Sequence, residues 1–141
     1  MRDFVYERSK IFNNHPVFAL ITSKICLVEL ASAMEANLYL PGDYLVQKED
    51  FGHEMHFIES GIMNCYSMNE RQIILRIRGG DFMGEKALIN LTKRIYPIAA
   101  ETFCQVLSLS KRSFDTILAK FPQIESLVIE KCKCIHTSHN F

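Results

Sequence analysis

The chain has 141 residues, of which 48% are hydrophobic and 23% charged, a composition typical of one soluble globular domain with a single core. Its 16 acidic residues balance 16 basic ones, which argues against nucleic-acid binding, because phosphate neutralisation needs clustered positive charge. The longest apolar runs are far shorter than the ~20 residues that cross a bilayer. Five scattered cysteines, an odd number, fit a reducing cytosol. We therefore expect a cytoplasmic domain that neither binds nucleic acid nor inserts directly into a membrane.

The first third of the chain has helical periodicity. Four apolar residues recur at helical spacing with polar residues between them, namely Phe18, Ile21, Ile25 and Val28. The polar residues 13–15 and Pro16 interrupt this region. The sequence therefore predicts a short helix that ends near Phe12 and another that begins beyond Pro16.

From Met34 the hydrophobic period changes to two, which is typical of a strand with one buried face. The apolar residues of this alternation are Met34, Ala36, Leu38 and Leu40. Further strands are predicted at Tyr44–Gln47, Met55–Glu59, Ile62–Met68, Gln72–Arg78, Pro97–Thr102 and Cys104–Ser110, with one short helical turn at Gly84–Asn90. Short, closely spaced strands separated by turns indicate an antiparallel barrel or roll of about eight strands.

The helical period returns after Ser110, which is placed to cap a helix. This helix carries an apolar stripe of Phe114, Ile117, Leu118 and Phe121. Pro122 can occupy the first position of a second helix, whose apolar stripe is Ile124, Leu127, Val128, Cys132 and Ile135. The expected fold is α+β in one domain over 1–141: a helical lead-in (1–33), a jelly-roll-like β-roll (34–110), two hinge or lid helices (111–135) and a tail (136–141).

Three motifs in the roll carry a family resemblance through their order and spacing. They are Leu40–Leu45 (LPGDYL), Phe57–Gly61 (FIESG) and Asp81–Ile89 (DFMGEKALI), with Arg94 nine residues after Glu85. Similar segments lie at the end of the lead-in, at Val17–Phe18, and downstream at Ala100–Cys104, Leu107–Ser110 and Phe121–Pro122. Together they resemble the cyclic-nucleotide-binding domain of hyperpolarisation-activated, cyclic-nucleotide-gated and ether-à-go-go-like cation channels.

The resemblance implies a phosphate-binding cassette over 81–97. In the family, the glutamate at Glu85 accepts a hydrogen bond from the ribose 2′-hydroxyl, and the arginine at Arg94 pairs with the cyclic phosphate. A glycine allows close backbone approach, helix-start amides favour an anion, and an arginine fork suits two phosphate oxygens. The candidate contacts to cAMP or cGMP are Gly84, Glu85, Lys86, Ala87, Arg94, Ile95 and Tyr96. We expect no catalytic residue, metal or other cofactor.

Four residues depart from the family pattern. Ile95 lacks a hydroxyl, which costs only ~0.5–1.5 kcal/mol of ligand binding. Tyr96 stands where a methyl group lets the phosphate approach, Pro97 removes a backbone donor, and Lys86 adds a charge where the family is apolar. We favour a degenerate pocket with weak or absent nucleotide binding, filled by Tyr96 or by the tail His136–Phe141. The alternative is that Tyr96 points outward and Glu85 with Arg94 still hold a nucleotide.

The functional prediction is a cytoplasmic regulatory domain of a plasma-membrane cation channel, potassium-selective or hyperpolarisation-activated, which acts in gating or assembly. Its expected partners are the rest of the channel and its subunits, with assembly as a homodimer or homotetramer, and we do not expect it to be an enzyme. The alternatives are a genuine cAMP or cGMP sensor, or a regulatory domain of a sodium/proton exchanger or a kinase. The pairs His53/His56 and Cys132/Cys134 have the wrong spacing or too few partners for a metal site.

Overall fold

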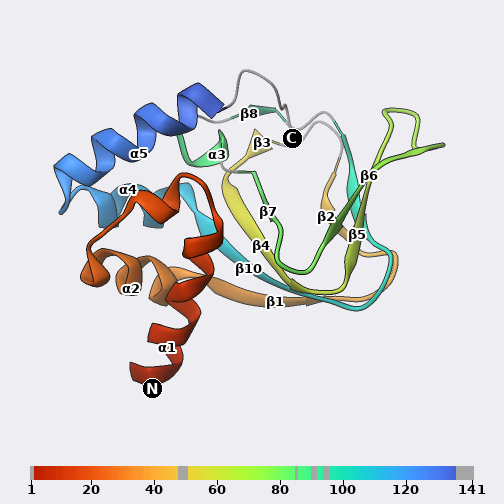
Figure 1. The fold of residues 1–141 in the computed structure, drawn as a ribbon. Coiled ribbons are helices and arrows are strands. Elements are labelled where there is room, and N and C mark those ends of the chain that lie inside the picture. The colour runs from red at the N-terminus through yellow and green to blue at the C-terminus, as the bar shows by residue number, and fades with distance from the viewer. Residues whose placement is uncertain (1, 48–50, 85, 90–91, 94–95, 136–141) are drawn as a thin grey trace.

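The computed structural model describes residues 2–47, 51–84, 86–89, 92–93 and 96–135. Its helices are α1 (Arg2–Ser9), α2 (Lys24–Ala33), α3 (Lys86–Ile89), α4 (Lys111–Leu118) and α5 (Pro122–Ile135), with 3-10 helices η1 (Lys10–Asn14) and η2 (Phe18–Leu20). Its strands are β1 (Glu35–Tyr39), β2 (Tyr44–Val46), β3 (Phe51–Gly52), β4 (Glu54–Ser60), β5 (Ile62–Tyr66), β6 (Ile73–Arg78), β7 (Phe82–Met83), β8 (Thr92–Lys93), β9 (Ile98–Ala100) and β10 (Cys104–Ser110). The lead-in and the C-terminal helices gather at one end of the roll (Figure 1).

The strands form a roll in which every pairing is antiparallel. Sheet A has the order β1-β10-β4-β7, sheet B has the order β2-β9-β5-β6, and β3 pairs with β8. The predicted α+β roll with flanking helices is confirmed. The described residues form ten strands rather than about eight, because β3, β7 and β8 have two residues each and are too short to show a hydrophobic period.

The lead-in is helical, but its apolar face differs from the predicted one. Ile21 is extended and ends η2, and the Ser23 hydroxyl then caps α2 by accepting a hydrogen bond from the Cys26 amide at 3.2 Å. Because α2 begins only at Lys24, its residues do not continue the helical spacing that starts at Phe18, and Ile25 is 71% exposed. The buried face of α2 consists instead of Cys26, Leu30 and Ala31.

Strand β1 lies where the alternation predicted it, but the expected inward face is wrong. Leu38 is 62% and Leu40 57% exposed, whereas Met34 is buried. Strand β1 is an edge strand of sheet A, and its far end extends beyond the helices that cover the other end (Figure 1). Tyr39, on the opposite face from Leu38, is partly buried against the inside of the roll.

The two C-terminal helices begin where the sequence predicts, but Leu127, predicted on the apolar stripe of α5, is 38% exposed because it lies to one side of the face that Ile124 and Val128 turn to the core. The Ser110 hydroxyl accepts a hydrogen bond from the Ser113 amide at 3.1 Å and caps α4. The buried residues of α4 are Phe114, Ile117 and Leu118. Pro122 is the first residue of α5, and Val128 is its fully buried contact. The predicted contacts of Cys132 and Ile135 lie outside the described side chains.

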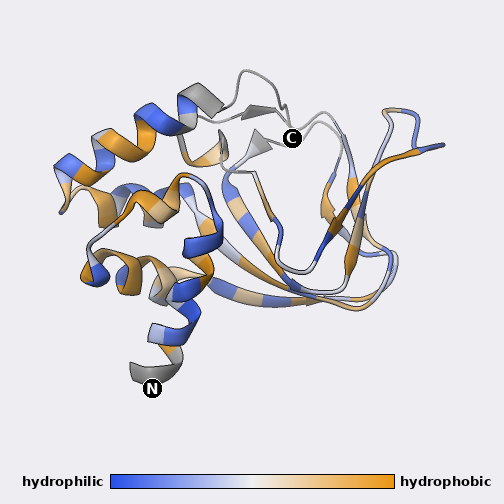
Figure 2. Ribbon diagram, viewed as in Figure 1, coloured by the Kyte–Doolittle hydropathy of each residue, from blue (hydrophilic) through white to orange (hydrophobic). Residues whose placement is uncertain are grey.

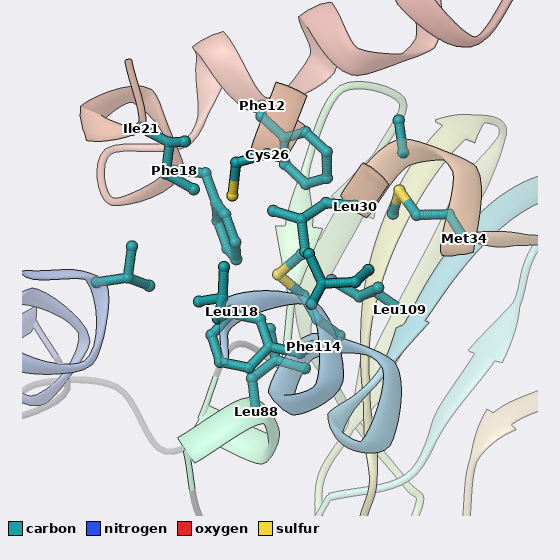
Figure 3. Packing of buried hydrophobic residues seen from close by; sticks show 14 of the residues in the cluster. Phe12, Phe18, Ile21, Cys26, Leu30, Met34, Leu88, Leu109, Phe114 and Leu118 are labelled. Carbon is teal, nitrogen blue, oxygen red and sulfur yellow. The ribbon is translucent and has the colours of Figure 1, made fainter. Parts of the chain in front are cut away.

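Two hydrophobic clusters lie on opposite faces of sheet A. The helix-side cluster packs the lead-in, α4 and α5 against the sheet and includes Phe12, Phe18, Leu30, Leu109 and Phe114 (Figure 3). The roll cluster fills the space between the sheets and consists of Val46, Ile58, Met63, Cys65, Ile77, Met83, Ile98, Ala100, Cys104 and Val106. Successive residues of a strand point to opposite faces, so β4 and β10 contribute to both clusters.

Phe82 of β7 connects the lead-in to the start of the predicted cassette. Its ring lies 6.2 Å from Phe12, 5.0 Å from His15 and 4.7 Å from Phe57, measured between ring centroids. His15 is itself buried, and its Nδ1 accepts hydrogen bonds from the amides of Val17 at 3.0 Å and Phe18 at 3.2 Å. The aromatic contacts therefore fix the helical lead-in against the strand that precedes Gly84.

Candidate nucleotide-binding site

The predicted cassette begins at the edge of sheet A. Strand β7 pairs with β4, with Met83 opposite His56 and Phe82 opposite Phe57. Gly84 follows with φ +83°, a conformation that L side chains rarely adopt. The Ala87 amide then donates a hydrogen bond to the Gly84 carbonyl at 3.0 Å as α3 begins. The local backbone is thus a strand, a glycine turn and a short helix, as the resemblance implies.

The structure locates only some of the seven candidate contacts. Gly84 and Ala87 are both buried at the start of α3, and Lys86 is the first residue of that helix. Glu85, Arg94 and Ile95 lie outside the described residues, as does the side chain of Lys86. The pairing of Glu85 with a ribose and of Arg94 with a phosphate stays a prediction.

Tyr96 is the bulkiest candidate whose side chain the structure describes. It is partly buried and packs against the roll cluster, in company with Tyr39 and Leu45. Burial, reinforced by the carboxylates of Glu54 and Asp43, raises the pKa of Tyr39, so its phenol stays neutral near physiological pH. The rings of Tyr39 and Tyr96 therefore lie at the edge of the apolar interior of the roll.

The residue after Tyr96 has a different environment. Pro97 is buried, its carbonyl accepts a hydrogen bond from the Tyr66 amide at 2.9 Å, and it lines an open depression of about 280 Å³ together with Tyr44, Gln47 and Glu70. The Tyr44 hydroxyl donates a hydrogen bond to Glu70 Oε1 at 2.6 Å, and this bond raises the pKa of Tyr44. No sequence motif pointed to this depression, because it joins segments far apart in the chain.

Two negative findings apply to the described part of the chain. No three His, Cys, Asp or Glu side chains there are grouped so that they could hold a metal ion. No described helix is long and apolar enough to cross a bilayer. Polar and apolar residues alternate along the longer helices and strands (Figure 2).

The sequence model of the cyclic nucleotide-binding domain family matches residues 37–121. This segment is more than half of the chain and includes both sheets and the cassette. The chain belongs to the cyclic nucleotide-binding domain family. The predicted resemblance is therefore confirmed at the level of the family.

Two kinds of curated relative resemble this cyclic nucleotide-binding domain. The mouse potassium/sodium hyperpolarization-activated cyclic nucleotide-gated channel 2 is 24% identical over 115 residues, which are 82% of this chain and 13% of the channel. The cAMP-dependent protein kinase regulatory subunit of Colletotrichum orbiculare is 34% identical over 90 residues, which are 64% of this chain and 23% of the subunit. The chain thus spans a small part of the length of either relative.

Solved structures show the same fold. The C-linker/CNBHD structure of zELK channels, crystallised in the presence of cAMP, has a TM-score of 0.80 and 20% identity, and the match covers 99% of this chain and 70% of that one. A cyclic nucleotide-binding-like protein from Brucella abortus has a TM-score of 0.72 and 23% identity, covering 80% of this chain and 98% of that one.

Proposed function

We propose that this domain is a cytoplasmic regulatory domain of a plasma-membrane cation channel and that its nucleotide pocket binds cAMP and cGMP weakly or not at all. The domain would act in gating or assembly through contacts with the rest of the channel, as a homodimer or homotetramer. It would not be an enzyme, in keeping with the regulatory rather than catalytic role of cyclic nucleotide-binding domains.

The observation that carries this proposal is the position of Tyr96. Its side chain packs against the roll cluster beside Tyr39 and Leu45, whereas an outward-pointing phenol would leave the interior open to a ligand. Two residues earlier in the sequence stands Arg94, the predicted partner of the phosphate. A bulky ring that contacts the interior so close to this arginine opposes the approach of a nucleotide, because overlapping groups must be displaced before the ligand can bind.

The channel context rests on the relatives and on the lead-in. The zELK match covers almost the whole chain, including the helices before the roll. In this domain the lead-in contacts Phe82 at the start of the cassette, so a change at the cassette has a packed route to the N-terminal helices. A two-state gating element needs such a contact, since each state must be stabilised by its own interactions.

A genuine cAMP or cGMP sensor is the second candidate, and the cassette backbone favours it. Gly84 is buried with positive φ, and the short helix α3 begins two residues later, at Lys86. These features present backbone amides to an anion. In this candidate Glu85 and Arg94 hold the nucleotide and Tyr96 moves aside. A kinase relative of higher identity than the channel relative supports it as well.

Calorimetric titration with cAMP and with cGMP separates the two candidates. We expect no saturable heat from the unmodified domain at ~1 mM nucleotide, equivalent to a binding free energy weaker than about −4 kcal/mol. We expect Tyr96→Ala to gain at least about tenfold in affinity, since removal of the ring opens the site.

Two further variants control this experiment. Tyr96→Phe keeps the ring and should behave like the unmodified domain, and Tyr96→Ala combined with Arg94→Ala should lose the gained binding. Micromolar binding by the unmodified domain that Arg94→Ala abolishes would overturn the degenerate pocket and establish the sensor.

A further inference from the structure

A depression on sheet B combines a carboxylate with an aromatic ring. Tyr44, Gln47, Glu70 and Pro97 line it, and its volume is about 280 Å³. The Tyr44 hydroxyl donates a hydrogen bond to Glu70 Oε1 at 2.6 Å, so the phenol and the carboxylate lie side by side. Strand β2 and the turn between β5 and β6 bring these two residues together on the side of the roll away from the helices (Figure 1).

Strand alternation places this depression on the outer face of sheet B. Ile98 and Ala100 belong to the roll cluster, so Ala99 between them faces away from the interior. Ala99 is paired with Tyr44, and paired residues of neighbouring strands lie on the same face of a sheet. The depression is therefore distinct from the proposed nucleotide pocket, which lies at the margin of the roll cluster.

The turn that carries Glu70 is fixed by its own hydrogen bonds. The Ser67 amide donates to the Gln72 carbonyl and the Glu70 amide to the Ser67 carbonyl, each at 2.8 Å. Oδ1 of Asn69 accepts from the Arg71 amide at 3.0 Å and from the Ser67 hydroxyl at 2.7 Å. Glu70 itself has φ +59°, a left-handed conformation that is uncommon for any residue but glycine. Because the turn and the bond to Tyr44 both hold Glu70, a ligand finds its carboxylate already ordered.

The Glu70 carboxylate has hydrogen-bonding capacity to spare. An ionised carboxylate has about four acceptor sites, and the Tyr44 hydroxyl occupies one of them. Arg71 is exposed beside it, and no ion pair among the described residues joins the two side chains. The bond to Glu70 raises the pKa of Tyr44, so the phenol stays neutral. The four lining residues thus present one formal charge, which is negative.

A flat cation fits this combination of groups. A guanidinium donates hydrogen bonds to a carboxylate in a planar fork and also stacks on an aromatic face. Here both groups are offered together, and Pro97 adds apolar surface next to them, against which the aliphatic stem of an arginine can pack. We propose that this depression binds an arginine side chain of a partner protein that lies along the outer face of sheet B. The test contains no nucleotide, so this inference and the proposed function can fail independently.

The test is an NMR titration of the full 141-residue chain with N-acetyl-arginine methylamide at low salt. We expect saturable shifts of the backbone amides of Tyr44, Glu70 and Arg71, with a dissociation constant of about 1–10 mM. N-acetyl-citrulline methylamide is the matched probe, because it has nearly the same shape and no charge. We expect it to bind at least about tenfold more weakly, since its hydrogen bonds to the carboxylate lack the charge.

Three variants locate the binding site. Glu70→Gln keeps an acceptor for the Tyr44 hydroxyl but removes the charge, and should weaken binding at least about tenfold. Tyr44→Phe keeps the ring but removes the hydroxyl that holds the carboxylate, and should weaken binding about two- to tenfold. Glu59→Gln is the matched control and should leave binding unchanged, because Glu59 is an exposed carboxylate of β4 outside the depression. The amides of Leu107 and Leu118 verify the fold of each variant in the same spectra.

Three outcomes would overturn the proposal. The first is the absence of any saturable shift in the unmodified chain up to ~50 mM of the arginine probe. The second is equal affinity for the arginine and citrulline probes, and the third is an equal loss in Glu70→Gln and Glu59→Gln. The first two are read in the unmodified chain, so the proposal stays testable even where a variant fails to fold.

Discussion

The two hydrophobic clusters share the strands of sheet A but differ in what covers them. The helix-side cluster is covered by the lead-in and by α3, α4 and α5, and its fully buried rings include Phe12, Phe18 and Phe114. The roll cluster lies between the two sheets, and Tyr39, Leu45 and Tyr96 pack at its margin. We call the first the closed side and the second the open side, because the proposed nucleotide pocket lies at the margin of the second.

The largest expected effect comes from opening the closed side. Phe114→Ala removes a ring that is 1% exposed and packs edge-to-face on Phe18 at 6.2 Å. We expect the free energy of unfolding to fall by about 3–5 kcal/mol, since the ring leaves a cavity. Phe103→Ala is the matched control, because Phe103 is 49% exposed, and should change stability by no more than about 0.5 kcal/mol. Equal losses in urea denaturation would contradict the role of Phe114 as a buried core residue of the closed side.

The second effect concerns His15, the buried histidine whose ring contacts Phe18 of the closed side and Phe82 of β7. His15→Ala leaves the buried amides of Val17 and Phe18 without their acceptor. We expect a loss of about 2–4 kcal/mol, measured by urea denaturation. His15→Asn should recover part of it, because an asparagine oxygen accepts hydrogen bonds from amides two or three residues later. If both variants lose the same amount, the ring contacts with Phe82 matter more than the hydrogen bonds.

The third effect compares one thiol from each cluster. Burial raises the pKa of Cys26, on the helix side, and of Cys65, in the roll, to about 11 in each case. A thiol in the unfolded chain has its ordinary pKa of 9.0, so the folded state favours the neutral form. The stabilisation is complete below pH 9 and is lost as the pH rises towards 11, by about 1–2 kcal/mol per thiol.

Denaturation of Cys26→Ala and Cys65→Ala at several pH values measures this effect. Each variant should lose a similar part, about 1–2 kcal/mol, of the pH dependence seen in the unmodified domain above pH 9, and the remainder belongs to other groups such as the phenol of Tyr39. A much smaller share for Cys65 would show that water reaches the roll interior more readily than the static burial indicates. That result would sharpen the contrast between the clusters rather than remove it.

The smallest effect comes from the surface of the closed side. Lys120 Nζ and Glu29 Oε1 lie 2.6 Å apart and join the turn after α4 to α2, with the two side chains 59% and 32% exposed. A double-mutant cycle with alanine should give a coupling energy of about 0.2–1 kcal/mol. The coupling should fall in ~1 M salt, where charges are strongly screened. A larger, salt-independent coupling would mean that this ion pair, and not the apolar packing, holds α2 against α4.

Much of the fold could be predicted from local patterns, because those patterns have local causes. Ser110 caps α4 and Pro122 begins α5 as the sequence indicated. The buried face of α2 could not be predicted, because the extended residue Ile21 resets the helical phase and leaves Ile25 exposed. The outward face of β1 depends on how far the helices extend over sheet A, which is a tertiary property.

Only part of the candidate site could be predicted from the sequence. The position of the cassette follows from Gly84 and the order of the motifs, and the backbone there agrees. The sequence left open whether Tyr96 points outward or packs against the roll cluster. The direction of this side chain depends on the three-dimensional path of the chain. The hydrogen bond between His56 and Ser108 joins residues 52 positions apart, and no local sequence pattern predicts it.

The double use of β4 and β10 has a practical consequence. Val106 and Leu107 are adjacent in the chain, fully buried, and packed into different clusters. Since both interiors are close-packed against one thin sheet, a displacement on one face changes the packing on the other. A spectroscopic label on the helix side, such as a fluorine on the ring of Phe57, would thus report changes inside the roll. The label would lie on the opposite face of sheet A from the proposed nucleotide pocket.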